Sequence, residues 1–580
     1  MREALGSADL EPIPQFPDED YLKHEDVPAH PQSSFRESDG VLMINMTDAL
    51  RMAAAGNREY QTQKEDVFRT ALRLDLADQN FRLTWDGLIT NTTNADLSGP
   101  PDTFDNRTQG TLGLTQRLKN GITFNTALTM NLVALLTGNK PSARGITGDA
   151  SISLPLMRGS GEFIVTEPLT QAQRDLVYAI YRFERFKRTF AVRVFNEYLS
   201  VLQQYDQVRN AEDNYRRLVT STRRAQRLQE AGRLKPIEVD QSRQNELRSR
   251  ASWIGSQQSL ARRLDSFKQL LGLPVDARIE MDRSVLEGMY QRAKDWGDKL
   301  DREEGPTEVP GADVPVVLEP ANTQDRGPYE LEERQSILLA LRNRLDLKIA
   351  VGRVLDRQRN TAVAADRLRA DLTLLARGSA GALAGTDGEN KRLEPGDGNY
   401  STVLSLDLPL ERTGERNSYR FSLIDLEAAI RSLQENEDTV KLEIRNNLRR
   451  LLEQRENLRI QSRALTLAER RVNSTNLFLE AGRAQIRDLL EAQDALVTAQ
   501  NAFTSAMVSY RVAELEMQRD LEVLEVGDDG SVLEVDPSTF TAIPPAAQPN
   551  AVIEGTNNDD AMTPMEAPPV EAPADQGVQP

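Results

Sequence analysis

The chain has few side chains that could do catalytic or metal chemistry. It contains no cysteine and two histidines, His24 and His30, both in an N-terminal stretch rich in proline and acidic residues. This inventory argues against a thiolate zinc site, a disulfide framework and a Ser/His/Asp triad. The stretch RGSAGALAG has glycines but lacks the Lys-Ser/Thr of a phosphate-binding loop. With 89 acidic residues, carboxylate pairs are so common that none indicates acid/base catalysis. We therefore predict no enzymatic activity, no cofactor and no metal site.

Composition narrows the class of protein further. The net charge of −18 argues against a nucleic-acid binder, which needs a basic face. No run approaches the roughly 20 apolar residues of a membrane-spanning helix, and the first twenty residues do not predict a signal peptide. At 580 residues the chain exceeds one ordinary domain, so we expect a repeat or an elongated architecture.

One tetrapeptide, Glu-Ala-Gly-Arg, occurs twice, at residues 230–233 and 480–483. Long apolar-periodic stretches flank each copy, so we predict two helical hairpins with Gly232 and Gly482 in their turns. Before the second copy, apolar residues recur every seven positions, which predicts packing against a partner helix with left-handed supercoiling. These residues are Ile444, Leu451, Leu458, Leu465, Val472 and Leu479. Displaced by 250 positions, the same pattern begins at Val194 and Val201 and fades toward the first turn.

Ahead of each hairpin the apolar period changes from that of a helix to that of a strand. Ile152, Leu154 and Leu156 alternate with polar residues or proline, and so do the leucines from Leu404 to Leu410. An Asn120-Gly121 turn precedes another such alternation. Strands of about ten residues with one apolar and one polar face are the weak signature of a transmembrane β-barrel.

Each half also opens with an apolar run that ends in asparagine, and we align Asn57 with Asn343. Between this asparagine and the tip glycine the first half carries 36 more residues than the second (Asn57 to Gly232 against Asn343 to Gly482). The Thr/Asn/Gly-rich stretch near 91–148 holds this surplus. We predict an enlarged loop or an extra β-hairpin there.

These patterns divide the chain into five segments. A first structural repeat spans 41–280, and a second spans 330–526. The other predicted segments are a disordered N-terminal extension at 1–40, a linker or insert at 281–329, and a disordered acidic, Pro/Ala-rich tail at 527–580. Within the repeats we expect strands at about 83–157 and 369–410, and long hairpins at 162–272 and 416–526.

In this order, the doubled motifs resemble the TolC family of outer membrane efflux proteins. The resemblance rests on MTDALRMAAAGNREY and SILLALRNRLDL, on SLPLMRGSG and DLPLERTG, on EAGRLKPIEVDQSR and EAGRAQIRDLLEAQ, and on FKQLLGLPVDARIEMD. It implies a mainly α fold with a transmembrane β-barrel. Each chain of a homotrimer would give four strands to a shared barrel and its helical hairpins to a trimeric α-barrel. The location implied is the bacterial outer membrane, with the helices spanning the periplasm.

The resemblance also implies a function and its partners. The protein would be the exit duct of a tripartite efflux or type I secretion-like system, through which small molecules or polypeptides pass passively. Besides the outer membrane lipid, its partners would be a periplasmic adaptor protein and an inner-membrane transporter, and not nucleic acid. The residues implied to dock the adaptor are those of the tip turns: Gly232, Arg233, Leu234, Gly482, Arg483 and Ala484.

Acidic residues after the tips would narrow the tunnel in this family. The matching residues here are Asp488 and Glu491, with Glu238 in the first repeat, and three copies of each would form carboxylate rings. The tyrosine and arginine that latch the closed tip in well-known members are Leu479 and Ala484 here, so the resemblance does not imply the same latch for this chain.

Other interpretations stay open from the sequence. The tip glycines also serve as simple helix stops, and Asp488 and Glu491 also fit a solvated helix face, with Arg487 paired to Glu491. A soluble coiled-coil scaffold explains the seven-residue repeats but not the duplicated strands. A periplasmic adaptor is expected to have one hairpin, whereas this chain has two.

Overall fold

The computed structural model describes residues 41–96, 103–136, 142–303, 321, 323, 326–385, 389–408, 410–527 and 530–533. The predicted disordered extension at 1–40 and most of the predicted tail, from residue 534 onward, lie outside these residues. Two residues of the predicted tail, Val532 and Leu533, form β10 (Val532–Leu533), which pairs in antiparallel with β9 (Glu525–Val526). The tail prediction is therefore wrong for this segment, because Val532 pairs with Val526 and extends the ordered repeat.

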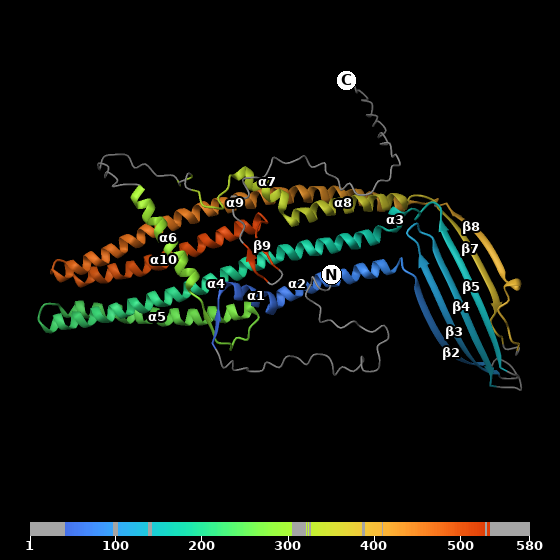
Figure 1. Cartoon of the computed structure of the whole chain (residues 1–580), viewed down its shortest axis with the longest axis horizontal. Coiled ribbons are helices and arrows are strands. Elements are labelled where there is room, and N and C mark those ends of the chain that lie inside the picture. Colours follow the sequence, from blue (N-terminus) through green and yellow to red (C-terminus); the bar gives the residue numbers. More distant parts are fainter. Residues whose placement is uncertain are drawn as a thin grey trace, which may run out of the picture. The chain divides into compact units, whose positions relative to one another are not determined.

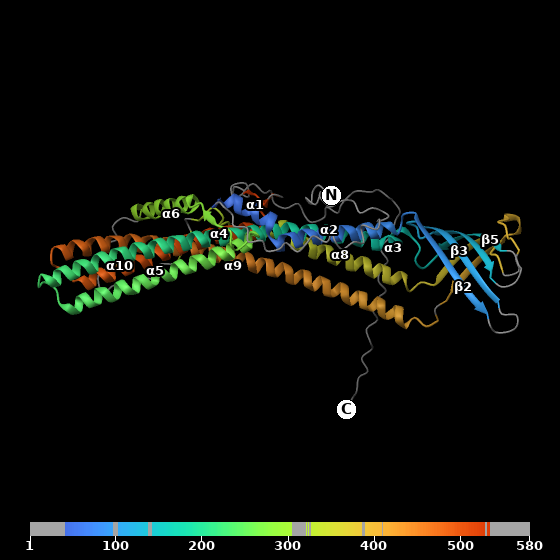
Figure 2. The ribbon, with the colours of Figure 1, turned by 90° about the horizontal axis from the view of Figure 1, so that it is seen from below.

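Two long helical hairpins dominate the fold (Figure 1). The first consists of α4 (Glu167–Glu230) and α5 (Pro236–Leu271), and the second of α9 (Thr413–Glu480) and α10 (Ile486–Asp520). With 68 residues, α9 is about 100 Å long at 1.5 Å per residue. Both turns lie at the same end of the hairpins, as two perpendicular views agree (Figures 1 and 2).

The seven-residue pattern marks the buried side of these helices, as predicted. Leu451 is almost fully buried, and Ile444, Val194 and Val201 are fully buried. Together with Phe267 of α5 and Phe503 of α10, the two α4 residues belong to one core formed by both repeats. Burial of these apolar side chains packs the two hairpins against each other.

A pair of shorter helices leads into each repeat. They are α1 (Met46–Gly56) and α2 (Arg58–Gln79) in the first repeat, and α7 (Glu333–Asn343) and α8 (Leu345–Asp366) in the second. The residues at the two joints are Asn57 and Arg344, so the alignment of Asn57 with Asn343 is wrong by one position. The corrected surplus of the first half is 37 residues (Asn57 to Gly232 against Arg344 to Gly482).

One antiparallel sheet of six strands joins the two repeats in the described part of the chain (Figure 1). In sheet order the strands are β2 (Thr84–Asp96), β3 (Thr103–Arg117), β4 (Thr123–Leu135), β5 (Ala143–Pro155), β7 (Asp371–Ala382) and β8 (Asn399–Asp407). The first repeat supplies four strands and the second two. The resemblance implies four strands per chain, and this number is wrong for this protein. The surplus residues of the first half form an extra hairpin, as one of the two predicted alternatives.

The cross-strand register divides the sheet into an apolar and a polar face. Trp85 lies in one row with Leu114, Thr126, Ala150 and Tyr400, whereas Thr84 lies in the next row with Thr115, Asn125, Ser151 and Ser401. The apolar face is exposed on β2, β3, β4, β5 and β8. Each of these side chains is at least about a third accessible: Trp85, Ile89, Leu112, Phe124, Leu128, Met130, Leu132, Ile152, Tyr400, Leu404 and Leu406.

Smaller elements complete the fold. β1 (Leu42–Ile44) pairs in parallel with β6 (Ile279–Met281), and α6 (Ser284–Glu303) follows within the predicted insert. The remaining elements are α3 (Glu162–Val165), which precedes α4, and the 3₁₀ turn η3 (Pro395–Asp397), which precedes β8. None of the helices in the described residues combines the length and the apolar character needed to cross a membrane.

Candidate functional site

Both Glu-Ala-Gly-Arg turns have the same backbone geometry. Gly232 and Gly482 have φ angles of 69° and 71°, in the left-handed region. In the first turn the Gly232 N–H donates to the Gln229 carbonyl, and the Arg233 N–H donates to the Leu228 carbonyl at 2.8 Å. The second turn repeats both bonds. This pair of bonds is the Schellman motif, which satisfies the last carbonyls of a helix.

The conformation of the two glycines, and not lack of space, explains why glycine occupies these positions. A Cβ atom added to Gly232 or Gly482 would meet no atom within 4 Å. Arg233 and Arg483 are exposed beside them. The tips therefore present an open surface with one arginine at each turn.

The two tips are held together by a small apolar cluster. Its buried members are Leu218, Ala225 and Val239 from the first hairpin, and Ile486 and Leu490 from the second. Leu234 of the first turn and Leu479 of α9 pack against this cluster. Leu479 thus has an apolar packing role.

Asp488 caps the helix that follows the second turn. The Gln485 N–H donates to Asp488 Oδ2 at 3.0 Å, and the Gln485 side chain accepts from the Asp488 N–H, which completes a capping box. Glu238 occupies the matching position of α5, where the cap residue is Lys235 and no side-chain cap is present. The two predicted acidic positions are therefore structurally equivalent but make different contacts.

Glu491 lies one turn further along α10 and pairs across the hairpin. Its carboxylate is 3.0 Å from Arg471 of α9, and the two side chains are 66% and 51% exposed. The expected partner Arg487 is not the one found, because the hairpin brings α9 beside α10. An exposed pair of this kind adds little stability, at most about 1 kcal/mol.

The structure thus brings the six predicted tip-turn residues and the three acidic residues to one end of the two hairpins. Gly232, Arg233, Gly482 and Arg483 are exposed, while Leu234 and Ala484 are half-buried. A ring would be formed by Asp488, Glu491 or Glu238 of several copies, whereas the structure contains one chain. Their role in a ring therefore stays a prediction.

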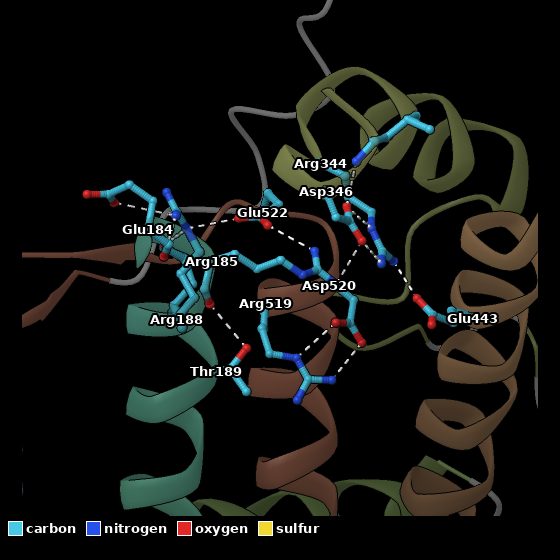
Figure 3. Close-up of polar contacts among 12 residues, drawn as sticks. Glu184, Arg185, Arg188, Thr189, Arg344, Asp346, Glu443, Arg519, Asp520 and Glu522 are labelled. Carbon is cyan, nitrogen blue, oxygen red and sulfur yellow. Dashed lines mark hydrogen bonds and ion pairs between the residues drawn. The ribbon is translucent and has the colours of Figure 1, made fainter. Parts of the chain in front are cut away.

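A second polar site, which the sequence did not reveal, joins the two repeats away from the tips (Figure 3). Arg185 of α4 lies between Glu522, at 3.0 Å, and Asp346 of α8, at 3.3 Å. Asp346 also accepts from Arg344 at 2.7 Å, and Arg344 in turn donates to Glu443 of α9. We call this chain of alternating charges, from Glu522 to Glu443, the repeat junction. It connects α4 with α8, α9 and the end of α10.

Glu522 is the most constrained member of the repeat junction. Its side chain is 2% exposed and lies 3.1 Å from Arg188 as well as beside Arg185. Its φ angle is 56°, and no other described non-glycine residue has a positive φ. Burial raises the pKa of Glu522, and the charges of Arg188 and Arg185 oppose this shift without cancelling it.

The pKa of Asp346 is shifted in the opposite direction. Burial alone would raise its pKa, but the hydrogen bond from Arg344 and the charges of Arg185 and Arg344 outweigh burial and lower it. Asp346 is therefore ionised wherever the protein is folded near neutral pH. The only sequence signal for the junction was the dense mixture of arginine and acidic residues in these helices, which does not single out partners.

Comparison with known proteins places this geometry among channel structures. No family model matches the chain, and no curated protein matches it. Among solved structures, CusC, whose structures concern transmembrane channel formation, is 13% identical with a TM-score of 0.56, over 84% of this chain and 96% of that chain. The outer membrane channel CmeC of Campylobacter jejuni is 13% identical with a TM-score of 0.55, over 86% and 88%.

The outer membrane protein VceC of Vibrio cholerae is similar in the same way. It is 13% identical with a TM-score of 0.54, over 82% of this chain and 95% of that chain. At such identities the likeness concerns the fold. The chain therefore has the fold of outer membrane channels of the TolC family, and the resemblance predicted from its sequence is confirmed at that level.

Proposed function

We propose that the protein is a channel in the bacterial outer membrane that extends into the periplasm and serves efflux. The observation that carries this proposal is the exposed apolar face of the six-stranded sheet. Trp85, Ile89 and Leu404 on this face are 66%, 81% and 63% exposed. An apolar face of this extent is not stable in water but matches a lipid environment. The opposite face is mainly polar: it carries threonine, serine, asparagine and aspartate, and also Leu88, Leu375 and Val403. A mainly polar face is what a water-filled lumen requires.

Three copies of the chain would close one shared β-barrel and one α-barrel. The sheet has two free edges in the described residues, and such edges need a partner. Substrates would move passively through the tube, and the energy for export would come from an inner-membrane transporter. Small molecules and polypeptides are both compatible with this route.

The tips would contact the partners of a tripartite system. The open turns at Gly232 and Gly482, each with a neighbouring arginine, offer a repeated surface to a periplasmic adaptor protein. Asp488 and Glu491, with Glu238 in the first repeat, would line the aperture as rings of carboxylates. Rings of acidic side chains favour cations over anions.

Conductance in a planar lipid bilayer tests both parts of this proposal. We expect the purified, detergent-solubilised protein to give long-lived, cation-selective openings. The variant with Asp488→Asn and Glu491→Gln should shift the reversal potential in a salt gradient toward zero, since it removes the carboxylates. Asparagine keeps an oxygen for the Gln485 N–H, so the helix cap is retained.

Glu287→Gln is the matched control, because Glu287 is an exposed carboxylate on α6 and away from the tips. It should leave the reversal potential unchanged. A double variant with unaltered selectivity would remove Asp488 and Glu491 from the aperture. A protein that stays dissolved without detergent and gives no conductance would contradict the channel itself, and would favour the coiled-coil scaffold.

A further inference from the structure

The six-stranded sheet ends in two strands, β2 and β8, that each have one unpaired edge among the described residues. We propose that β2 of one copy pairs with β8 of the next, with Thr84 opposite Asp407 of the neighbouring copy, so that each copy gives six strands to the shared sheet. This inference rests on the proposed function and adds the strand number and the register.

Strand direction permits this pairing. Every neighbouring pair in the sheet is antiparallel. Because the number of strands is even, β2 and β8 run in opposite directions. A second copy placed at the edge therefore continues the antiparallel ladder without a parallel junction.

The register follows from where the strands meet the helices. Within one copy, Thr84 shares a cross-strand row with Ser401. However, β2 begins at Thr84, five positions after α2 ends at Gln79, whereas β8 continues to Asp407, six positions before α9 begins. The helix-connected ends of the two strands come level only when Thr84 pairs with Asp407, six residues beyond Ser401.

This offset also gives a closed barrel an ordinary geometry. A stagger of six residues over six strands is one residue per strand. The eight-stranded barrel of shear eight has the same ratio of shear to strand number, and its strands tilt by about 36°. Closed barrels have tilts of about 35–45°. With no stagger, only residues 84–86 would overlap with residues 399–401. With the stagger, all nine residues of β8 find partners.

The two faces of the sheet continue across the proposed seam. Because the stagger is even, Trp85 lies opposite Leu406 on the apolar face, and Thr90 lies opposite Ser401 on the polar face. Trp85 and Leu406 are 66% and 53% exposed in the single chain, so their pairing covers apolar surface. A shift by one residue would set Trp85 against a polar residue of the other face.

Disulfide trapping in membranes tests the register, and the native chain has no cysteine to interfere. In the variant with Thr90→Cys and Ser401→Cys, the two cysteines lie directly opposite each other in the proposed register. Directly opposed Cα atoms are about 4.5–5.5 Å apart, within the range that a disulfide spans. Mild oxidation should convert the monomer band on non-reducing gels into cross-linked dimers and larger closed species.

The variant with Thr92→Cys and Ser401→Cys is the control, since the same face is used but the register is shifted by two residues. Diagonal Cα atoms lie about 7–8 Å apart, beyond easy disulfide formation, so this variant should stay largely monomeric on the gel. The serine counterparts of both pairs check that folding and conductance are retained.

The possible results separate this inference from the proposed function. Preferential cross-linking of the Thr92 pair, or no cross-link in protein that forms oligomers and conducts, would overturn the register. Protein that neither conducts nor forms oligomers would overturn the proposed function and the seam together. Cross-linking of the Thr90 pair alone supports six strands per copy and a seam between β2 and β8.

Discussion

At the scale of single residues, the tip glycines are explained by backbone conformation alone. We expect Gly482→Ala to lower the free energy of unfolding by about 1 kcal/mol, because alanine is disfavoured at a φ of 71°. Gly482→Asn should cost less, since asparagine tolerates this region. Chemical denaturation of the three proteins measures the difference. Equal stability of all three proteins would contradict the left-handed Schellman geometry. If both variants also lose adaptor binding, the adaptor must need the turn without a side chain at position 482.

Glu522 makes the protein less stable as the pH rises, which is unusual for a buried carboxylate beside two arginines. Its folded pKa is raised, so its contribution is full below the unfolded value of about 4.5 and is lost as the pH rises through the folded pKa. We expect Glu522→Gln to unfold at a higher temperature than the native protein near pH 8. The difference should shrink toward pH 4.5.

Asp346 does not contribute to the pH dependence between pH 4.5 and pH 8, because its lowered pKa keeps it ionised throughout this range.

Thermal unfolding at several pH values measures the stability difference between Glu522→Gln and the native protein, and Glu287→Gln serves again as an exposed control. A Glu522→Gln protein that is less stable than the native one near pH 8 would mean that the pairs with Arg185 and Arg188 outweigh the cost of burial.

At the scale of elements, the close approach of two glycines fixes the end of α5 against the end of α1. A Cβ atom on Gly272 would lie 2.1 Å from the Gly56 carbonyl oxygen, and Gly272 has a φ of 75°. We expect Gly272→Ala to lower the free energy of unfolding by about 3 kcal/mol or more, since overpacking and a disfavoured φ add.

Gly255→Ala is the matched control within the same helix. Gly255 has open space around its Cα and lies in the interior of α5, so alanine should stabilise the helix by up to about 1 kcal/mol. Denaturation curves of the two variants measure opposite shifts. A Gly272→Ala protein as stable as the native one would show that α1 and α5 can move apart.

The elements also show how far sequence reasoning reached. Period-seven and period-two patterns predicted the hairpins and most strands, because burial on one side acts on every residue of an element. The predicted joint at Asn343 lies one residue before the observed one at Arg344, because asparagine is by residue type a better helix cap than arginine. The sequence does not distinguish an enlarged loop from an extra hairpin near 91–148, because its beginning, from Asn91 to Asn94, is Thr/Asn-rich on both faces of β2. The Arg471–Glu491 pair and the repeat junction depend on tertiary neighbours, which no local pattern encodes.

At the scale of the whole molecule, the two repeats share one core and one sheet. The core contains residues of both repeats, β5 of the first pairs with β7 of the second, and the repeat junction connects α4 with the second repeat. The fold-level resemblance found from doubled motifs thus describes one interlocked unit with two similar halves.

The extra hairpin bears on the width of the proposed channel. Each repeat has one long helical hairpin. In a barrel closed as proposed above, each copy would add two strands to the four that the resemblance implies, and the diameter of a closed sheet grows roughly linearly with strand number. Six strands instead of four would widen it by a factor of about one and a half. Two neighbouring strands of an antiparallel sheet can be added or removed without reversing the chain between α2 and α3. Under the proposed function, one genetic insertion or deletion would therefore widen or narrow the barrel and leave the sequence of the tip turns unchanged.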